Sequence, residues 1–282
     1  MRLHTALAAA LVLAGSAAPA ATPAVALAPG PVQAVRFTYE VHAIGLTVAQ
    51  IEATMVLDPS GYRATMAYHT VGLYGALKPA RSATQSQGRW TADGVAPVRY
   101  ASTARLHSED RHVLISYRDG NPDVQTLLPP NAGRWEPVAP AMQAHTIDDL
   151  SAIVLLIHHV VTTGTCNAAT RTFDGRRLTA IEATTVGDQQ LPRGADSPYV
   201  GNALRCSFQG QQLAGFENND SPFARKPHDG SAWFAQVLPG APSLPVRISF
   251  ATRWFGAAVA VMTHAELIAP GAAAAPGAAV TP

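Results

Sequence analysis

The pattern of apolar and polar residues predicts one long helix in a chain that otherwise alternates as β-strands do. Across residues 146–161, apolar side chains recur with the 3.6-residue period of an α-helix. Thr146 and Asp149 fit a capping box, in which side-chain oxygens accept hydrogen bonds from free N–H groups of the first turn. We therefore expect a central helix at about residues 147–161. Its apolar stripe consists of Ile147, Leu150, Ile153, Val154, Ile157, Val160 and Val161.

Alternating apolar and polar residues predict a succession of strands before this helix. The expected strands cover residues 35–43, 49–57, 62–68, 82–90, 95–105 and 112–117. Asp58-Pro59-Ser60-Gly61 has Pro and Gly where a type I turn favours them, so it joins two of these strands in a hairpin. Gly72 and Gly75 interrupt the apolar stretch 71–77, which we interpret as a strand segment with a bend or a bulge. Residues 129–140 are rich in Pro and are expected to be irregular.

Further strands are predicted after the helix, at residues 171–173, 178–185, 199–216, 233–238, 246–254 and 257–268. Asp174-Gly175 is a tight-turn dipeptide between the first two of them. Short strands separated by frequent turns are typical of sandwiches, barrels and curled sheets. We therefore expect a mainly β fold, with an antiparallel curled sheet that is barrel-like or a two-half β architecture, and with one central α-helix.

The N-terminal residues have the composition of a secretory signal peptide. Arg2 and His4 precede an apolar run at residues 6–15, and Ala18-Pro19-Ala20 is a small-x-small cleavage pattern. The run is too short for a spanning helix, although a retained anchor is the alternative. We expect the signal to end at residue 20, or near residue 26 at a second pattern, Ala24-Val25-Ala26. No cysteine lies near either point, so we expect a periplasmic or secreted protein without lipid attachment or a transmembrane span after cleavage.

Composition divides the rest of the chain into a linker, a domain and a tail. Residues 21–34 are mostly Ala, Pro and other small residues and form the expected linker. Residues 35–268 form one expected β-rich domain, whose two halves, 35–128 and 171–268, lie on either side of the helix. Residues 269–282 consist mainly of Ala, Pro and Gly, with too few large side chains to form a core, which predicts a disordered tail.

The net charge indicates which partners to exclude, and the cysteine content indicates whether a disulfide is expected. A formal net charge of +1 argues against nucleic acid or a strongly anionic surface as the main partner. The chain has two cysteines, Cys166 and Cys206, and a single pair in an exported protein is usually oxidised. We expect a disulfide between them, and two free buried thiols are the alternative.

The sequence contains no phosphate-binding loop, G-x-S-x-G elbow, H-E-x-x-H or C-x-x-C motif. His158 and His159 are adjacent, so on a helix they point about 100° apart. They do not fit the i, i+3 or i, i+4 spacing of paired metal ligands. His107 and His112 could approach each other across a hairpin tip, but no third ligand is indicated. We therefore expect no cofactor and no metal site.

The remaining candidate residues have structural explanations beside the functional ones. Asp148 and Asp149 could form a catalytic carboxylate pair, but acids in a first helical turn also complement the macrodipole. Ser151 could be a nucleophile or a small residue on the helix surface. Arg176 and Arg177 could contact an anionic group of a ligand, or belong to an exposed turn or an ion pair. We assign no catalytic residue.

Several short motifs follow one another along the chain: Gly61-Tyr62-Arg63, Gly88-Arg89-Trp90 with Pro97, Asp149-Leu150-Ser151-Ala152, Cys166, Phe173-Asp174-Gly175-Arg176-Arg177, Cys206, Pro245-Val246-Arg247-Ile248 and Phe255-Gly256. In this order and spacing they resemble the DUF 3108 family, a group of exported bacterial proteins named only as a domain of unknown function. The resemblance covers about residues 35–268. It implies an envelope-facing, β-rich protein without an assigned activity, and it implies no catalytic residues.

These observations lead to three hypotheses on function. In the first, which we favour, the protein is non-catalytic and binds a lipid, a glycan or an envelope protein, because a curled sheet closed by an amphipathic helix can leave an apolar groove. In the second, it is a structural or scaffolding partner in cell-envelope assembly. Residues 129–140 and the pairs Trp233-Phe234 and Trp254-Phe255 would then be contact surface, unless these aromatic residues pack in the core or at a sheet edge. In the third, it is a hydrolase of dispersed residues that uses His158 or His112.

Overall fold

The computed structural model describes residues 33–92, 94–106, 108–194, 198–252 and 256–269 of the 282-residue chain. The predicted signal peptide, nearly all of the linker and the tail from residue 270 lie outside the described residues. His107, Trp254 and Phe255 lie outside them as well.

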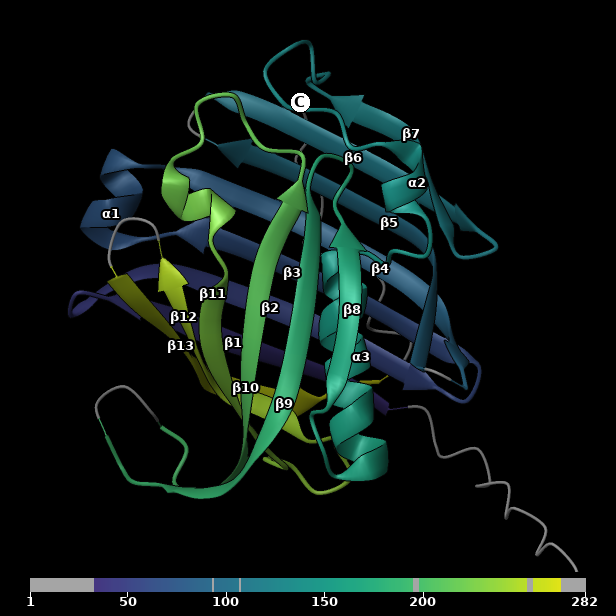
Figure 1. The fold of residues 1–282 in the computed structure, drawn as a ribbon. Coiled ribbons are helices and arrows are strands. Elements are labelled where there is room, and N and C mark those ends of the chain that lie inside the picture. Colours follow the sequence, from purple (N-terminus) through teal and green to yellow (C-terminus); the bar gives the residue numbers. More distant parts are fainter. Residues whose placement is uncertain (1–32, 93, 107, 195–197, 253–255, 270–282) are drawn as a thin grey trace, which may run out of the picture.

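Thirteen antiparallel strands form a single curled sheet, barrel-like and nearly closed (Figure 1). Neighbours in sequence pair with each other, and the pairing of β1 with β13 joins the two halves; β7 and β8 are the edges. The predicted mainly β fold with one long helix is confirmed. The strands are β1 (Gln33–Ala43), β2 (Leu46–Asp58), β3 (Gly61–Thr70), β4 (Ala80–Thr91), β5 (Gly94–Leu106), β6 (Glu109–Arg118), β7 (Asn121–Leu128), β8 (Ala168–Phe173), β9 (Leu178–Leu191), β10 (Gly201–Ala214), β11 (His228–Ala235), β12 (Leu244–Thr252) and β13 (Gly256–Leu267).

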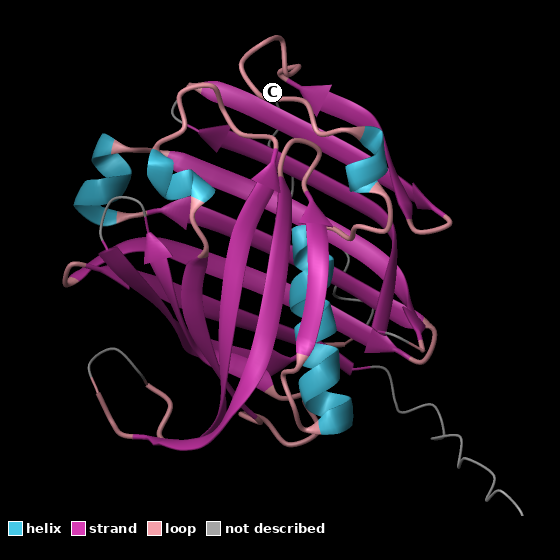
Figure 2. Cartoon of the chain, in the orientation of Figure 1, coloured by secondary structure: helices cyan, strands magenta, loops and turns pink. Residues whose placement is uncertain are grey.

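The register of the strands gathers several turns at one end of the sheet, which we call the mouth. The β1–β2 turn, the β8–β9 turn and the start of β11 all lie there, because antiparallel neighbours exchange direction at each pairing. Two short helices also belong to this end, α1 (Gly72–Leu77) after β3 and the 3-10 helix η1 (Pro222–Arg225) before β11. Figure 2 shows both as short coils beside the sheet.

The predicted central helix is α3 (Asp149–Thr163), which begins and ends two residues later than expected. The predicted capping box of Thr146 and Asp149 is wrong, because the N-cap is Asp148, whose side chain accepts a hydrogen bond from the Ser151 N–H at 2.8 Å. The helix cannot begin earlier because Ile147 is held as a strand residue against β8, donating to the Arg171 carbonyl and accepting from the Phe173 N–H. Gly164, with φ +68°, ends the helix in the left-handed conformation that glycine favours.

Helix α3 lies between the two parts of the curled sheet. It packs against β3, β4 and β5 on one side and against β8 on the other (Figure 1). Burying each large aliphatic side chain on this interface stabilises the fold by about 1.5–3 kcal/mol. The predicted stripe is largely correct, although Ile153 and Val161 are exposed and Leu155 is buried in their place. The buried residues of the helix are Leu150, Ser151, Val154, Leu155, Ile157 and Val160.

The prediction of a bent strand at residues 71–77 is wrong, because this segment is helix α1. The Gly75 N–H donates to the Val71 carbonyl at 2.8 Å, which closes a helical turn. A Cβ at Gly75 would lie 2.7 Å from the Thr70 carbonyl oxygen, so glycine is required for this close approach. A further short helix, α2 (Pro140–Gln143), follows the Pro-rich region.

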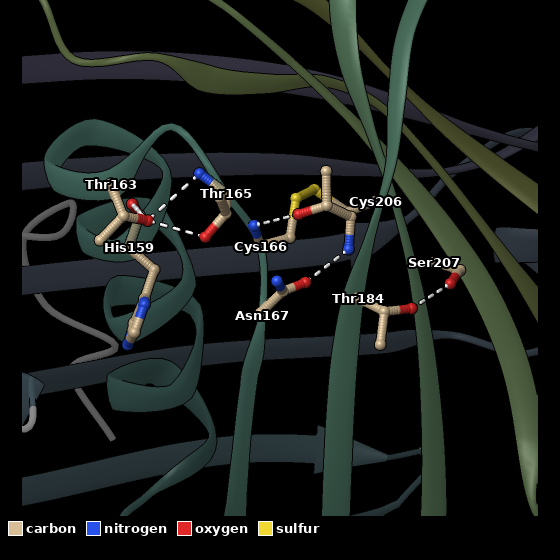
Figure 3. The surroundings of a disulfide bond; sticks show 9 residues. His159, Thr163, Thr165, Cys166, Asn167, Thr184, Cys206 and Ser207 are labelled. Atoms are coloured by element: carbon tan, nitrogen blue, oxygen red, sulfur yellow. Dashed lines mark hydrogen bonds between the residues drawn. A yellow bond between two sulfur atoms is a disulfide. The ribbon is translucent and has the colours of Figure 1, made fainter.

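The predicted disulfide between Cys166 and Cys206 is present (Figure 3). It joins the segment just after α3 to the middle of β10, with the two Cα atoms 5.9 Å apart, and both residues are completely buried. The Cys166 N–H also donates to Thr185 Oγ1 at 2.8 Å. A loop of this length contributes about 4 kcal/mol to stability in the chain-entropy model. The bond therefore fixes the exit of the helix against the second part of the sheet.

None of the helices within the described ranges has the length and apolarity that crossing a membrane would require.

Candidate functional site

Helix α3 begins in a buried cluster of polar side chains. One carboxylate oxygen of Asp148, Oδ2, accepts hydrogen bonds from Ser151 Oγ at 2.6 Å and from Ser86 Oγ at 3.0 Å. The Tyr62 hydroxyl lies 2.5 Å from Ser151 Oγ. These side chains come from β3, β4 and the first turn of α3, so the cluster joins the helix to the first part of the sheet.

The burial of Asp148 changes the pKa of its carboxyl group. Removal from water raises the pKa of its carboxyl group, while the hydrogen bonds from Ser151 and Ser86 act in the opposite direction. The positive end of the α3 dipole also favours the ionised form. Asp148 and Asp149 thus lie at the start of the helix as the macrodipole argument predicts.

The prediction that Ser151 is a helix-surface residue is wrong, because Ser151 is completely buried. Its hydroxyl contacts Tyr62, Ser86 and the Asp148 carboxylate, and each of these side chains is itself buried. The cluster therefore orders the helix start and offers no route for a substrate.

The turn between β8 and β9 carries Asp174-Gly175-Arg176-Arg177 to the mouth. Asp174 Oδ1 accepts hydrogen bonds from the backbone N–H groups of Arg176 at 2.8 Å and Arg177 at 2.6 Å. Gly175 has φ +94°, and a Cβ there would lie 2.9 Å from Val113 Cγ1 on β6. The turn thus packs closely against the first part of the sheet, and only glycine fits there.

The two arginines of this turn have different surroundings. Arg176 is buried and donates to Asn131 Oδ1 at 2.8 Å and to the Pro129 carbonyl, while its guanidinium lies 4.5 Å from the ring centre of Trp135. Its donors are thus engaged with the segment that follows β7. Arg177 lies next to it in sequence but lines an open pocket.

The pocket at the mouth has a volume of about 530 Å³ and is formed by α3, η1 and the second part of the sheet. Its polar wall includes Arg177 and four aspartates, Asp149, Asp174, Asp220 and Asp229. Its aromatic wall consists of Phe208 on β10, Phe223 on η1 and Phe250 on β12. Thr179, Gly210, Gln212, Ala224, His228 and Ala251 complete the lining.

The aromatic wall owes its shape to small residues in the neighbouring strands. Gly230 is the register partner of both Phe208 and Phe250, and a Cβ on it would lie 2.2 Å from the Phe208 ring. The absence of a side chain at Gly230 therefore lets the Phe208 ring lie across β11. Gly210 has no atom within 4 Å of its Cβ position, so it leaves open space inside the pocket. On the η1 side, the rings of Phe223 and His228 stack with centroids 4.0 Å apart.

Asp149 has the most perturbed carboxyl group of the pocket. Asp149 is an exposed residue that lines the pocket. Removal of its carboxyl group from bulk water, together with the nearby Asp174 carboxylate, raises the pKa of Asp149 to about 7. A hydrogen bond with Thr172 and the charge of Arg177 act in the opposite direction. The protonated form of Asp149 is therefore favoured more than in a free aspartate.

The histidines named from the sequence do not meet. His158 stacks on Trp90 with ring centroids 4.4 Å apart. The pKa of His158 is lowered mainly by its partial burial and, to a smaller extent, by the charge of the neighbouring His159. His112 is exposed on β6, and His107 lies outside the described residues. In the part of the chain that the structure describes, no three His, Cys, Asp or Glu side chains gather in an arrangement that could hold a metal ion.

Most of the pocket cannot be predicted from the sequence. Asp149, Asp174 and Arg177 are each singled out by the sequence, but no local pattern indicates that they lie together. Phe208 and Phe250 fall within the predicted strands 199–216 and 246–254. The one available signal for the η1 side was the polar, turn-rich stretch 218–230, which supplies Asp220, Phe223 and His228.

Comparison with known proteins gives a family match. A family model described as a protein of unknown function, DUF3108, matches residues 38–263. The comparison with curated proteins gives no match. Among solved structures, the chain is similar to a β-barrel-like protein of the domain of unknown function DUF1849 from Brucella abortus, with 11% identity, a TM-score of 0.48, and coverage of 84% of this chain and 98% of that chain. It is also similar to a putative outer membrane lipoprotein-sorting protein domain from Vibrio parahaemolyticus, with 7% identity, a TM-score of 0.29, and coverage of 86% and 89%. Likeness of this degree says nothing of what this chain binds.

Replacing Ser86 by Ala should destabilise the protein by about 1–3 kcal/mol, because the buried Asp148 carboxylate loses a donor that water cannot replace. Urea unfolding followed by circular dichroism measures this loss. Ser102→Ala is the matched control, since Ser102 is a serine of the neighbouring strand that is only partly buried and whose Oγ lies 3.2 Å from Thr84 Oγ1. Equal losses for the two variants would contradict the special role of the Asp148 cluster.

The raised pKa of Asp149 predicts a pH-dependent stability. Since its pKa is higher in the folded protein than the value of about 3.9 in an unfolded chain, the folded state binds more protons between these values. The stabilisation is fully present below about pH 4 and is lost as the pH rises through about 7. Urea unfolding at a series of pH values should show a smaller loss of stability in Asp149→Asn than in the wild type. Parallel pH profiles for the two proteins would disprove the shift.

Proposed function

The chain belongs to the DUF3108 family, whose function is unknown, and we propose that it is an exported, non-catalytic protein that binds a glycan in the mouth pocket. The observation that carries this proposal is the presence of two different walls in one pocket, one of aromatic rings and one of charged and amide side chains.

The composition of the pocket favours a glycan over the acyl chain that an apolar groove would suit. An acyl chain would bring hydrocarbon against Asp149, Asp174 and Arg177, and desolvating such charges without hydrogen-bonding partners is costly. A sugar ring has apolar C–H faces for Phe208 and Phe250, and hydroxyl groups at its edge for the polar wall. The volume of about 530 Å³ falls within the range of small-molecule sites.

Each wall has a distinct role in this proposal. Arg177 donates hydrogen bonds to ring or hydroxyl oxygens, and the carboxylates of Asp149 and Asp229 accept them from hydroxyl groups. Arg176 does not take part, because its donors are engaged by Asn131 and Pro129. Of the two arginines that the sequence suggests as contacts for an anionic group of a ligand, we therefore propose Arg177 alone.

A second candidate function is the hydrolysis of the bound glycan. Glycosidases use a protonated and an ionised carboxyl group on either side of the scissile bond. The raised pKa of Asp149, which lines the pocket together with Asp174, favours this candidate. Against it, Asp174 Oδ1 already accepts two backbone N–H groups of its own turn, which makes it a poor nucleophile. We therefore prefer binding without catalysis.

The scaffolding hypothesis receives less support. It needs residues 129–140 and the pair Trp233-Phe234 as exposed contact surface. Most of residues 129–140 are exposed, but the aromatic side chains that would anchor a partner are not, because Trp135, Trp233 and Phe234 are 3%, 8% and 3% exposed. The rings of Trp135 and Trp233 are instead flanked by arginine side chains of this chain.

Export into the periplasm or the medium is part of the proposal. It is supported by the signal-like N-terminus and by the Cys166–Cys206 disulfide, since such bonds persist in oxidising compartments. Intact mass spectrometry of the protein from its native cells should give a chain that starts after Ala20 or Ala26 and has no free thiol. A mature chain that retains Arg2 would count against cleavage.

Filling the pocket should abolish glycan binding without harming the fold. Gly210→Val adds a side chain into open space in a strand, where a β-branched residue is favourable. A panel of oligosaccharides is screened first on an array and then by titration calorimetry. We expect the affinity of retained glycans to fall by roughly tenfold or more, equal to about 1.4 kcal/mol.

The matched control is Gln211→Val, because Gln211 is the next residue of β10 and lines a groove on the opposite face of the sheet. It should bind as the wild type does. If no oligosaccharide is retained, or if fluorescent fatty acids are retained instead, the glycan proposal is wrong. Release of reducing ends from a bound oligosaccharide, lost in Asp149→Asn, would establish the hydrolytic candidate in its place.

A further inference from the structure

We propose that the mouth of the sheet docks on the surface of an anionic phospholipid membrane, through a set of exposed aliphatic side chains and a row of basic residues beside them. This inference does not depend on what the mouth pocket binds.

Four large aliphatic side chains are exposed on two adjacent elements of the mouth. Ile44 and Leu46, in and after the β1–β2 turn, are 67% and 49% exposed, and Leu73 and Leu77 of α1 are 70% and 68% exposed. Helix α1 packs against β2, and the Val71 N–H donates to the Val48 carbonyl at 3.0 Å, so the two elements are neighbours. We call Ile44, Leu46, Leu73 and Leu77 the apolar rim.

The fold itself does not require these side chains. Ile44 has φ +47°, a left-handed conformation that is unfavourable for a β-branched residue and that Asn, Asp or Gly would adopt more easily in a hairpin turn. Helix α1 buries none of its residues, and Leu73 and Leu77 are four residues apart, hence on one face. Exposure to water thus disfavours all four side chains, and backbone conformation also disfavours Ile44, which indicates that the side chains serve a contact outside the molecule.

A row of basic side chains crosses the sheet next to α1. His69 on β3 is the register partner of Arg81 on β4, and Arg81 is the register partner of Arg105 on β5. Like charges directly opposite each other, as at Arg81 and Arg105, destabilise a sheet, and an anion close to them would offset this repulsion. The three residues line a pocket of about 400 Å³ together with Thr70, Pro79 and Ala80, the last two of which connect α1 to β4.

The row has little compensation from acidic groups. Arg105 forms an exposed ion pair with Asp110 at 3.4 Å. Arg81 and Lys78, the residue after α1, have no ion pair among the described residues. The positive charge is therefore available to a phosphate group from outside.

The combination fits a lipid surface better than a protein. The rim is aliphatic and projects from the end of the sheet as a turn and a short helix (Figure 1), a shape that a deformable acyl layer accommodates. Basic residues that flank an apolar insertion are the arrangement by which peripheral proteins hold anionic headgroups. In this arrangement the rim enters the interface and the pocket of His69, Arg81 and Arg105 receives a lipid phosphate.

Flotation with lipid vesicles tests the proposal. The purified protein should float with vesicles of phosphatidylcholine and phosphatidylglycerol, and much less with vesicles of phosphatidylcholine alone. Leu73→Ser combined with Leu77→Ser should weaken binding by roughly tenfold or more, because two aliphatic side chains no longer leave water. Lys78→Gln combined with Arg81→Gln should weaken binding only to the vesicles that contain phosphatidylglycerol.

The control is Val161→Ser combined with Val186→Ser, two valines that are 51% and 56% exposed on α3 and β9. It should bind as the wild type does, and circular dichroism should show an unchanged fold in every variant, since all the changed residues are on the surface. The proposal is overturned if the wild type does not float with anionic vesicles. It is also overturned if the control variant loses vesicle binding as much as the rim variant does, or if the rim variant floats with anionic vesicles as well as the wild type.

Discussion

The two unpaired edges of the sheet, on β7 and β8, are the constraint on which the rest of this structure depends. A curled sheet that does not close exposes backbone donors and acceptors along both edges, which invites pairing with other chains. Here the segment before α3 covers part of β8 through the hydrogen bonds of Ile147, and α3 packs between β8 and the strands of the first part. At the mouth, Arg176 spans the remaining distance to Asn131 and Pro129 after β7. The gap in the sheet is thereby filled with side chains.

The residues that fill this gap also determine the position of the pocket at the mouth. Because Ile147 is held on β8, Asp148 becomes the N-cap of the helix, and its carboxylate is buried against Ser86 on β4. The next residue, Asp149, consequently points into the mouth beside Asp174 and Arg177. The turn that carries Arg176 into the gap carries Arg177 into the pocket. One short sequence, Asp174-Gly175-Arg176-Arg177, thus serves both stability and the candidate site, and substitutions in it will mix the two effects.

The pocket and the apolar rim lie at the same end of the sheet. The strand register places the β1–β2 turn and α1 at the end where β10 finishes and β11 begins. If the rim meets a membrane, the pocket opens close to that surface, where a glycan attached to a lipid would be within reach. The two proposals are separate, since the pocket variants and the rim variants share no residue, and their combination gives a consistent picture of a protein that works at the cell envelope.

Local patterns in the sequence are sufficient to predict most of the strands, the long helix and the turns that join neighbouring strands. Two-residue alternation predicts most of the strands, and 3.6-residue periodicity predicts α3, because each depends on short-range spacing alone. The disulfide followed from having only two cysteines, and the family from the order of short motifs. Which side chains are buried, by contrast, depends on contacts between distant parts of the chain. Ser151 is buried because β3 and β4 cover the first turn of α3, and Leu155 is buried where Ile153 and Val161 are exposed. The stretch 71–77 is helical, and glycine at position 75 permits this turn because a Cβ there would lie too close to the Thr70 carbonyl. Asp149, Arg177, Phe208 and Phe250 lie far apart in the chain and share a pocket because the sheet curls, and curling depends on contacts between distant strands that no local pattern encodes.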